Sequence, residues 1–209
     1  IIIMTGNREI TQVYDDPINK QLCKDIKFFL DQNFKQIKMT SKVDYRSREN
    51  VNHNFFFINK DNSNSSQNSL RNQLAITSIP RDLILKRKGY NFTLNNFYGN
   101  LIDIEFENFM KKNLIFQDFL MIAKKVKFLI IRNIPQLDDN VKNYIHRFIS
   151  LIDAFYENKN ILSISTRVEL DNIYTGKLNA VELKRTISRL KEMGSNTYIT
   201  KNLKNFVKK

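Results

Sequence analysis

Two arginines one helical turn apart, Arg185 and Arg189, are the clearest pair of cationic groups that could do chemistry in this sequence. Residues four apart share a side of a helix. This pair falls away from the apolar stripe formed by Leu183, Ile187 and Leu190. Guanidinium groups bind phosphate oxygens, so the pair could face a nucleotide or a neighbouring subunit. A solvated or salt-bridged helix face explains the same spacing, and we favour that interpretation.

The usual phosphate-binding loop is missing from these 209 residues. The loop needs the pattern G-x-x-x-x-G-K-[ST], because its glycines allow backbone amides to face the phosphates while Lys and a hydroxyl serve charge and Mg²⁺. Gly176-Lys177 is followed by Leu178, and Asp171 stands where the first glycine would be. The two histidines are far apart in the sequence and support neither a catalytic triad nor a metal site. We predict no metal ligands.

The composition is strongly basic, with a formal net charge of +13 and a pI near 9.7. A basic chain can bind polyanions. Here the cationic residues are spread along the sequence, which is rich in Lys, Asn and Ile. AT-rich coding produces such a bias, so we expect no specific nucleic-acid partner. The single cysteine, Cys23, excludes an intrachain disulfide and favours a cytoplasm-like compartment. Lysines interrupt the most apolar region, 119–131, so we predict no transmembrane segment.

Apolar periodicity predicts an α/β fold. The expected strands are 1–4, 36–39, 127–131 and 162–165, and the expected helices are 18–33, 106–123, 141–157 and 181–192. Three short strands between 82 and 106, with Gly89 and Gly99 at the turns between them, predict a small antiparallel meander. Asp138 and Asp139 are predicted as caps of the following helix.

Composition and apolar periodicity divide the sequence into four predicted regions. Residues 1–50 form one α/β region, 51–80 a low-complexity linker or insertion, 81–198 a second α/β region, and 199–209 a frayed basic tail. Within the linker, 59–73 has Leu70 as its one aliphatic residue. Ordering it would cost more entropy than burial returns, so we expect disorder or an exposed loop.

An internal echo relates the two α/β regions. The stretches 1–30 and 161–190 align without a gap, with identical residues that include Ile1/Ile161, Glu9/Glu169, Tyr14/Tyr174 and Leu30/Leu190. Both read as strand, polar elbow and helix. We interpret the second stretch as a structural repeat of the first.

Six segments, in order, resemble the ZapE-type ATPases, the Afg-like AAA+ family. They are "TGNREITQVY", "DYR", "FENFMKKNLIFQDFL", "KFLIIRNIPQL", "RFISLIDAFYENK" and "ELKRTISRLKEM". Together they cover nearly the whole chain up to about residue 198. The resemblance implies a partial AAA+ core of P-loop type, with the Walker A and Walker B segments preceding Ile1, so we expect the back portion of a longer ATPase.

The resemblance also implies roles for single residues. Asn7 falls at the sensor-1 position, where an amide orients the γ-phosphate or the attacking water. Lys20 falls at the arginine-finger position. Arg46 in "DYR", together with Arg185 and Arg189, are the candidates for nucleotide binding. In the family the cofactors are ATP and Mg²⁺, and we expect neither to bind this chain alone.

Departures from the family pattern point to lost activity. Lysine at position 20 cannot present the planar fork of a guanidinium. The family's acid before the I-P pair is Asn133 here. The resemblance implies a cytoplasmic or mitochondrial-matrix protein that remodels protein clients, linked to cell division in bacteria, as a homo-oligomer or with an upstream ATPase half. The alternative is a non-catalytic basic module that binds a partner protein or a polyanion.

Overall fold

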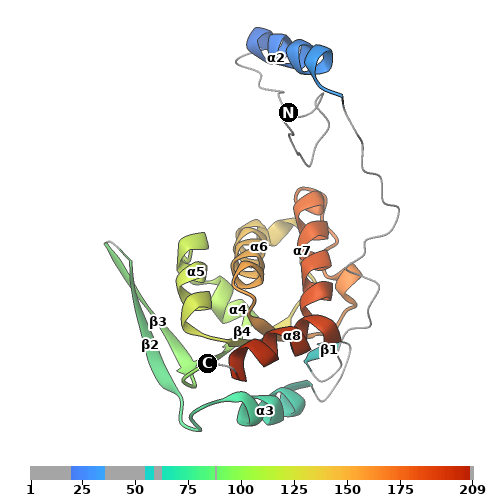
Figure 1. Cartoon of the computed structure of the whole chain (residues 1–209). Helices are drawn as coiled ribbons and strands as arrows, with labels where there is room; N and C mark the ends of the chain where they lie inside the picture. Colours follow the sequence, from blue (N-terminus) through green and yellow to red (C-terminus); the bar gives the residue numbers. More distant parts are fainter. Residues whose placement is uncertain (1–19, 36–54, 59–62, 88, 208–209) are drawn as a thin grey trace. The chain divides into compact units, whose positions relative to one another are not determined.

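The computed structural model describes residues 20–35, 55–58, 63–87 and 89–207 (Figure 1). The chain divides into two units, Ile1–Lys42 and Val43–Lys209, and each is considered by itself. In the first unit, α2 (Lys20–Asn33) confirms the helix predicted at 18–33 from its third residue on. The strands predicted at 1–4 and 36–39 lie outside the described residues, so the echo can be followed only in its second copy.

A six-stranded sheet forms the centre of the second unit, in the order β1-β6-β5-β4-β3-β2. Four neighbouring strands are parallel: β1 (Phe56–Ile58), β6 (Ile161–Thr166), β5 (Phe128–Ile134) and β4 (Leu101–Glu105). Two strands extend the sheet antiparallel: β3 (Tyr90–Phe97) and β2 (Arg81–Arg87). The predicted α/β class and the meander are confirmed. The arrangement is consistent with a P-loop-type α/β fold.

Helices lie on both sides of this sheet (Figure 1). One side carries α4 (Phe106–Met110), α5 (Phe116–Lys125), α6 (Lys142–Glu157) and α7 (Ala180–Met193). The other side carries α3 (Ser63–Leu74). Short 3-10 turns, η2 (Asp139–Val141) and η3 (Leu170–Asn172), follow β5 and β6, and α8 (Asn196–Val207) follows α7. The helices predicted at 141–157 and 181–192 are confirmed.

The two faces of the parallel strands differ in chemistry because successive side chains of a strand alternate between faces. One set is apolar and buried beneath the helices α4 to α6: Ile102, Ile104, Leu129, Ile131, Leu162 and Ile164. The other set points toward α3 and includes Asp103, Arg132 and Ser163, all buried. One face of the sheet is therefore apolar, and the other, which also carries Leu101, Ile130 and Ile161, contains the buried polar groups; we call this second face the polar face.

Helix α3 corrects the prediction of an exposed loop at 59–73. From Ser63 to Leu74 the chain is helical, with Gln67 and Leu70 buried against the sheet. The prediction from composition was wrong because a segment rich in polar residues is normally exposed to solvent. This helix covers the polar face, and its Gln67, Asn68 and Arg71 side chains meet polar partners there.

Two further predictions are wrong in part. The helix expected at 106–123 is broken into α4 and α5, and Asp118 Oδ2 accepts the Ile115 N–H at the start of the second helix, at 2.9 Å. The tail expected to fray from residue 199 is helical through Val207, with Ile199 and Asn202 buried. Gly89 and Gly99 adopt φ of +76° and +82°, as the tight turns of the meander require.

Candidate functional site

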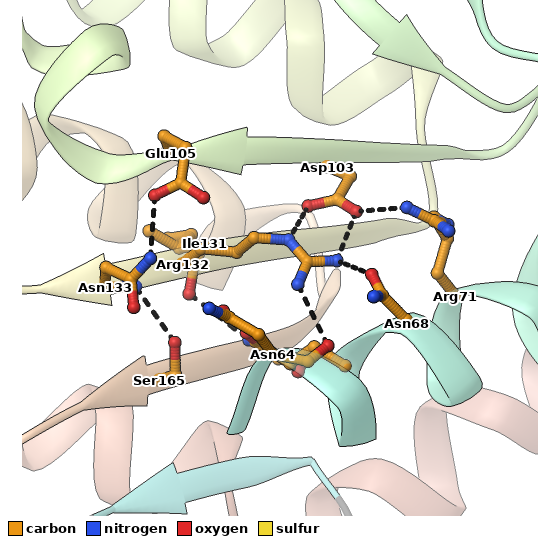
Figure 2. A network of polar contacts seen from close by, with 11 residues as sticks. Asn64, Asn68, Arg71, Asp103, Glu105, Ile131, Arg132, Asn133 and Ser165 are labelled. Carbon is orange, nitrogen blue, oxygen red and sulfur yellow. Dashed lines mark hydrogen bonds and ion pairs between the residues drawn. The ribbon is translucent and has the colours of Figure 1, made fainter. Parts of the chain in front are cut away.

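A charged cluster joins the polar face of the sheet to α3 (Figure 2). Asp103 on β4 accepts two bonds from Arg132 on β5, from Nε to Oδ1 and from Nη2 to Oδ2, each at 2.6 Å. Arg71 on α3 reaches Oδ2 of the same carboxylate at 3.2 Å. We call Asp103, Arg132 and Arg71 the Asp103 cluster. Such a bidentate pair is the strongest geometry available to a guanidinium and a carboxylate.

Within the Asp103 cluster, the Asp103–Arg132 pair is closed to outside ligands, whereas Arg71 is partly exposed. Arg132 also donates to the Asn64 carbonyl at 3.2 Å and to Asn68 Oδ1 at 2.9 Å, both on α3. Asp103 is 5% exposed and Arg132 is 8% exposed, and both carboxylate oxygens already accept bonds. A buried pair of this kind fixes the position of its elements and leaves no group ready to act as a base or to bind a nucleotide.

The exposed end of the same region lies at Asn133, directly after Arg132 (Figure 2). Asn133 has φ of +55°, and the pairing of β5 with β6 shifts register between Ile131 and Ile134. Its N–H donates to Ser165 Oγ at 2.9 Å, and its side-chain amide donates to Glu105 Oε2 at 3.0 Å. The position at which the resembled family has an acid is therefore occupied by Asn133. Its backbone N–H and its side-chain amide already donate hydrogen bonds to Ser165 and Glu105.

A second polar contact ties together the loops that follow β5 and β6. The Asp139 carboxylate accepts the Tyr174 hydroxyl and the backbone N–H groups of Lys177 and Leu178, the last two at 2.9 and 3.3 Å. The Lys177 N–H bond, followed by the Tyr174 bond, lowers the pKa of Asp139. Burial and then the Asp139 contact raise the pKa of Tyr174. Asp138 caps η2, as predicted. Asp139 instead accepts hydrogen bonds from the loop at 174–178.

Gly176 fits beside the Asp139 carboxylate because it lacks a side chain. A Cβ at position 176 would lie 2.3 Å from Asp139 Oδ1 and 2.4 Å from the Tyr174 hydroxyl. Real contacts are never so short, so any other residue would displace the carboxylate. The glycine of the Gly176-Lys177 pair, which does not fit the phosphate-loop pattern, thus makes room for an internal carboxylate.

Of the predicted site residues, Arg185 and Arg189 are described in full. Both contact Asp153 on α6: Arg185 Nη2 lies 3.3 Å from Oδ2, and Arg189 Nη1 meets Oδ1. Arg189 also lies over the Tyr156 ring, 5.0 Å from its centroid. The pair therefore holds α7 against α6, which is the salt-bridged face that the sequence favoured. Their proposed contact with a nucleotide stays a prediction.

The other predicted residues cannot be placed. Asn7 and Arg46 lie outside the described residues, and Lys20 is described only as the first residue of α2. Sequence reasoning missed the Asp103 cluster, although a signal existed. Asp103 and Arg132 each interrupt an apolar run, "LIDIE" and "FLIIRNI", that reads as a buried strand. Opposite charges inside two such strands predict an ion pair.

Among the described residues, no three acids, histidines or cysteines gather closely enough to hold a metal ion. Within the same ranges, every helix is too short or too polar to cross a bilayer.

Comparison with known proteins identifies relatives along nearly the whole chain. A family model described as AFG1-like ATPase matches residues 1–202. Lactation elevated protein 1 homolog B from Danio rerio is 24% identical over 198 residues, which are 93% of this chain and 39% of that protein. An uncharacterized protein from Schizosaccharomyces pombe is 25% identical over 178 residues, 83% of this chain and 39% of that protein. The chain thus spans about two fifths of the length of these relatives.

A shorter match concerns a bacterial protein. Cell division protein ZapE from Escherichia coli is 32% identical over 82 residues, which are 39% of this chain and 22% of that protein. No solved structure matches the chain.

Proposed function

Because the chain belongs to the AFG1-like ATPase family, we propose that it takes part in ATP hydrolysis as one portion of such an enzyme. The observation that carries this proposal is the family match over residues 1–202, which includes both units. The six segments that resemble the family lie in the same order along this range.

The two units divide the work in this proposal. The first unit brings the groups that act on nucleotide: Asn7 as the sensor that orients water or the γ-phosphate, and Lys20 at the position of the finger. Arg46, in the second unit, is a further candidate contact to nucleotide. The described part of the second unit is mainly a scaffold in this proposal, because its charges pair with one another within the Asp103 cluster and between α6 and α7. Arg185 and Arg189 would bind a nucleotide only after leaving Asp153.

ATP and Mg²⁺ are bound, in this proposal, by a phosphate-binding loop outside these 209 residues, because none of the sequence fits G-x-x-x-x-G-K-[ST]. The chain alone is then inactive. It works as a homo-oligomer or with an ATPase half that carries the loop. Its task is the remodelling of protein clients, in the cytoplasm or the mitochondrial matrix. Cell division, which the name of the E. coli relative states for that protein, is one candidate setting.

The test is reconstitution of ATPase activity. The full chain is mixed with the portion of a relative that carries its phosphate-binding loop, and phosphate release is followed over time. We expect the mixture to exceed the sum of its parts. Lys20→Arg should raise the rate, because an arginine finger can contribute a factor of ~10³ or more. Asn7→Ala should lower it.

Matched variants separate the site from general effects. Lys24→Arg makes the same change at an exposed position of α2 and should leave the rate unchanged. Asn91→Ala does so for the amide, on the exposed hairpin. If the mixture gains no activity and Lys20→Arg behaves like Lys24→Arg, the ATPase proposal fails and the non-catalytic interaction module takes its place.

A further inference from the structure

The edge of the sheet at which β4, β5 and β6 begin is built around two buried asparagines. Asn100 Oδ1 accepts the Ile76 N–H at 3.1 Å, and the Asn100 carbonyl accepts the Lys127 N–H at 2.7 Å. Asn160 donates to the carbonyls of Ala123 and Val126, at 3.0 and 2.6 Å. These bonds hold the connection after α3, the end of α5 and the turn after α6 side by side.

Lysines concentrate on this edge. Lys124 and Lys125 end α5, Lys159 lies in the turn between α6 and β6, and Lys201 lies one turn beyond Tyr198, whose hydroxyl donates to the Asn160 carbonyl. All four side chains are exposed, and none forms an ion pair with another described residue. Lys127 lies next to Lys159, but its ammonium is engaged, because it donates to the Lys159 carbonyl at 3.1 Å.

Acids are few on the segments that reach this edge. The described residues place Asp82, Glu157 and Glu192 there, and Glu192 accepts the Tyr156 hydroxyl at 2.7 Å. Some basic groups elsewhere in this unit do meet acids: Arg132 meets Asp103, Arg189 meets Asp153 and Lys191 meets Asp171. The four exposed lysines therefore outnumber the acids on these segments, and none of the four is held in an ion pair with another described residue.

Exposed aliphatic side chains lie beside these lysines. Ile76 is 68% exposed and Ile79 is 73% exposed, in the short connection between α3 and β2. Backbone bonds from Ile76 and Thr77 to the Tyr98 carbonyl anchor this connection, at 3.2 and 3.4 Å. Moving these two exposed aliphatic side chains from water into an apolar phase is favourable in free energy.

We propose that this lysine edge, made of Lys124, Lys125, Lys159 and Lys201 together with Ile76 and Ile79, docks on an anionic phospholipid surface. Ammonium groups meet lipid phosphates and carboxylates, while the two isoleucines enter the boundary between headgroups and acyl chains. Single-stranded nucleic acid fits less well, because it needs exposed aromatic rings for stacking. The tyrosines at this edge are engaged instead: Tyr98 is buried, and Tyr198 stacks on Tyr156.

The test is sedimentation of the full chain with vesicles at low and at physiological salt. We expect binding to vesicles of phosphatidylserine and phosphatidylcholine, no binding to phosphatidylcholine alone, and weaker binding as salt rises. Each lysine near an anionic surface contributes about fivefold to the binding constant, so Lys124→Ser/Lys125→Ser should reduce binding about 25-fold. Ile76→Ser/Ile79→Ser should reduce it about tenfold or more.

Matched variants on other surfaces make the result specific. Lys142→Ser/Lys184→Ser removes the same charge from exposed positions on α6 and α7, and Ile84→Ser/Val181→Ser removes exposed aliphatic groups elsewhere. Both should bind as the wild type does, with unchanged thermal melts for all four variants. The proposal is overturned if the control pairs lose as much binding as the edge variants. It is also overturned if wild type binds neutral vesicles equally, or binds a single-stranded oligonucleotide and leaves anionic vesicles free.

Discussion

The two faces of the parallel sheet are built on opposite principles. Beneath α4 to α6 the sheet presents aliphatic side chains, and the packing there is a conventional core. Beneath α3 it presents a carboxylate, a guanidinium and hydroxyls that find their partners on the helix. The apolar face gains stability from area removed from water, whereas the polar face fixes one arrangement of α3 through directional bonds. The comparison predicts that the faces will respond differently to mutation.

The largest expected effect is on the polar face. Asp103→Ala leaves Arg132 buried without its counter-charge, so we expect a loss of about 3–5 kcal/mol in the free energy of unfolding, measured with urea. The double variant Asp103→Leu/Arg132→Met removes both charges and should recover most of that loss. Glu107→Ala, which breaks an exposed pair with Lys111, is the control and should cost much less. Equal losses for the two single variants would contradict the account.

The apolar face should respond by volume alone. Ile131 is fully buried on β5, next to Arg132 in sequence but pointing to the opposite face. Ile131→Ala should cost about 3 kcal/mol through lost burial and the cavity left behind. No second substitution on the polar face should rescue it. Rescue by the Asp103→Leu/Arg132→Met pair would mean that the two faces are not independent.

A smaller effect is expected at Gln67, where the polar face is imperfectly satisfied. Its amide donates weakly to the Ile131 carbonyl and to Ser163 Oγ, at 3.4 and 3.3 Å, and its Oε1 has no partner. Gln67→Leu keeps the volume and removes the unpaired oxygen, so stability should stay within about 1 kcal/mol of wild type. A loss above about 2 kcal/mol would show that these long bonds contribute more than their geometry indicates.

The last prediction concerns the contacts of Asp139 with Tyr174, Lys177 and Leu178. Like the polar face, they join distant segments by directional bonds, but they lie nearer the surface. Because the folded protein lowers the pKa of Asp139, its contribution is present above the unfolded pKa of about 3.9 and is lost as pH falls through the folded value. Asp139→Asn should therefore be less stable than wild type at neutral pH, and the gap should close in acid. Urea unfolding of both proteins between neutral pH and pH 3 measures it. A gap that is constant with pH would contradict the assignment.

Much of the second unit could be predicted from apolar periodicity. The strands β5 and β6 carry short apolar runs and the helices α6 and α7 carry apolar stripes, and each was expected within a few residues of its position. The meander followed from the two glycines at its turns. These signals are local, so the sequence alone carries them.

What could not be predicted depends on contacts between distant segments. Helix α3 reads as a solvated loop because its polar residues make sense only against a polar sheet face, 30 to 100 residues away in the chain. Asp139 reads as a cap because its true partners, Tyr174 and Lys177, are 35 and 38 residues later. Arg185 and Arg189 were placed on one helix face correctly, but their partner on α6 follows only from the packing of the two helices.

The central proposal is that the chain is one portion of an AFG1-like ATPase and does not bind nucleotide by itself. Calorimetric titration of Mg-ATP into the isolated full chain tests it most directly, with the mixture of chain and loop-bearing portion as the positive control. The account predicts no heat of binding for the isolated chain at micromolar nucleotide and clear binding for the mixture. Micromolar binding of Mg-ATP to the isolated chain would contradict it.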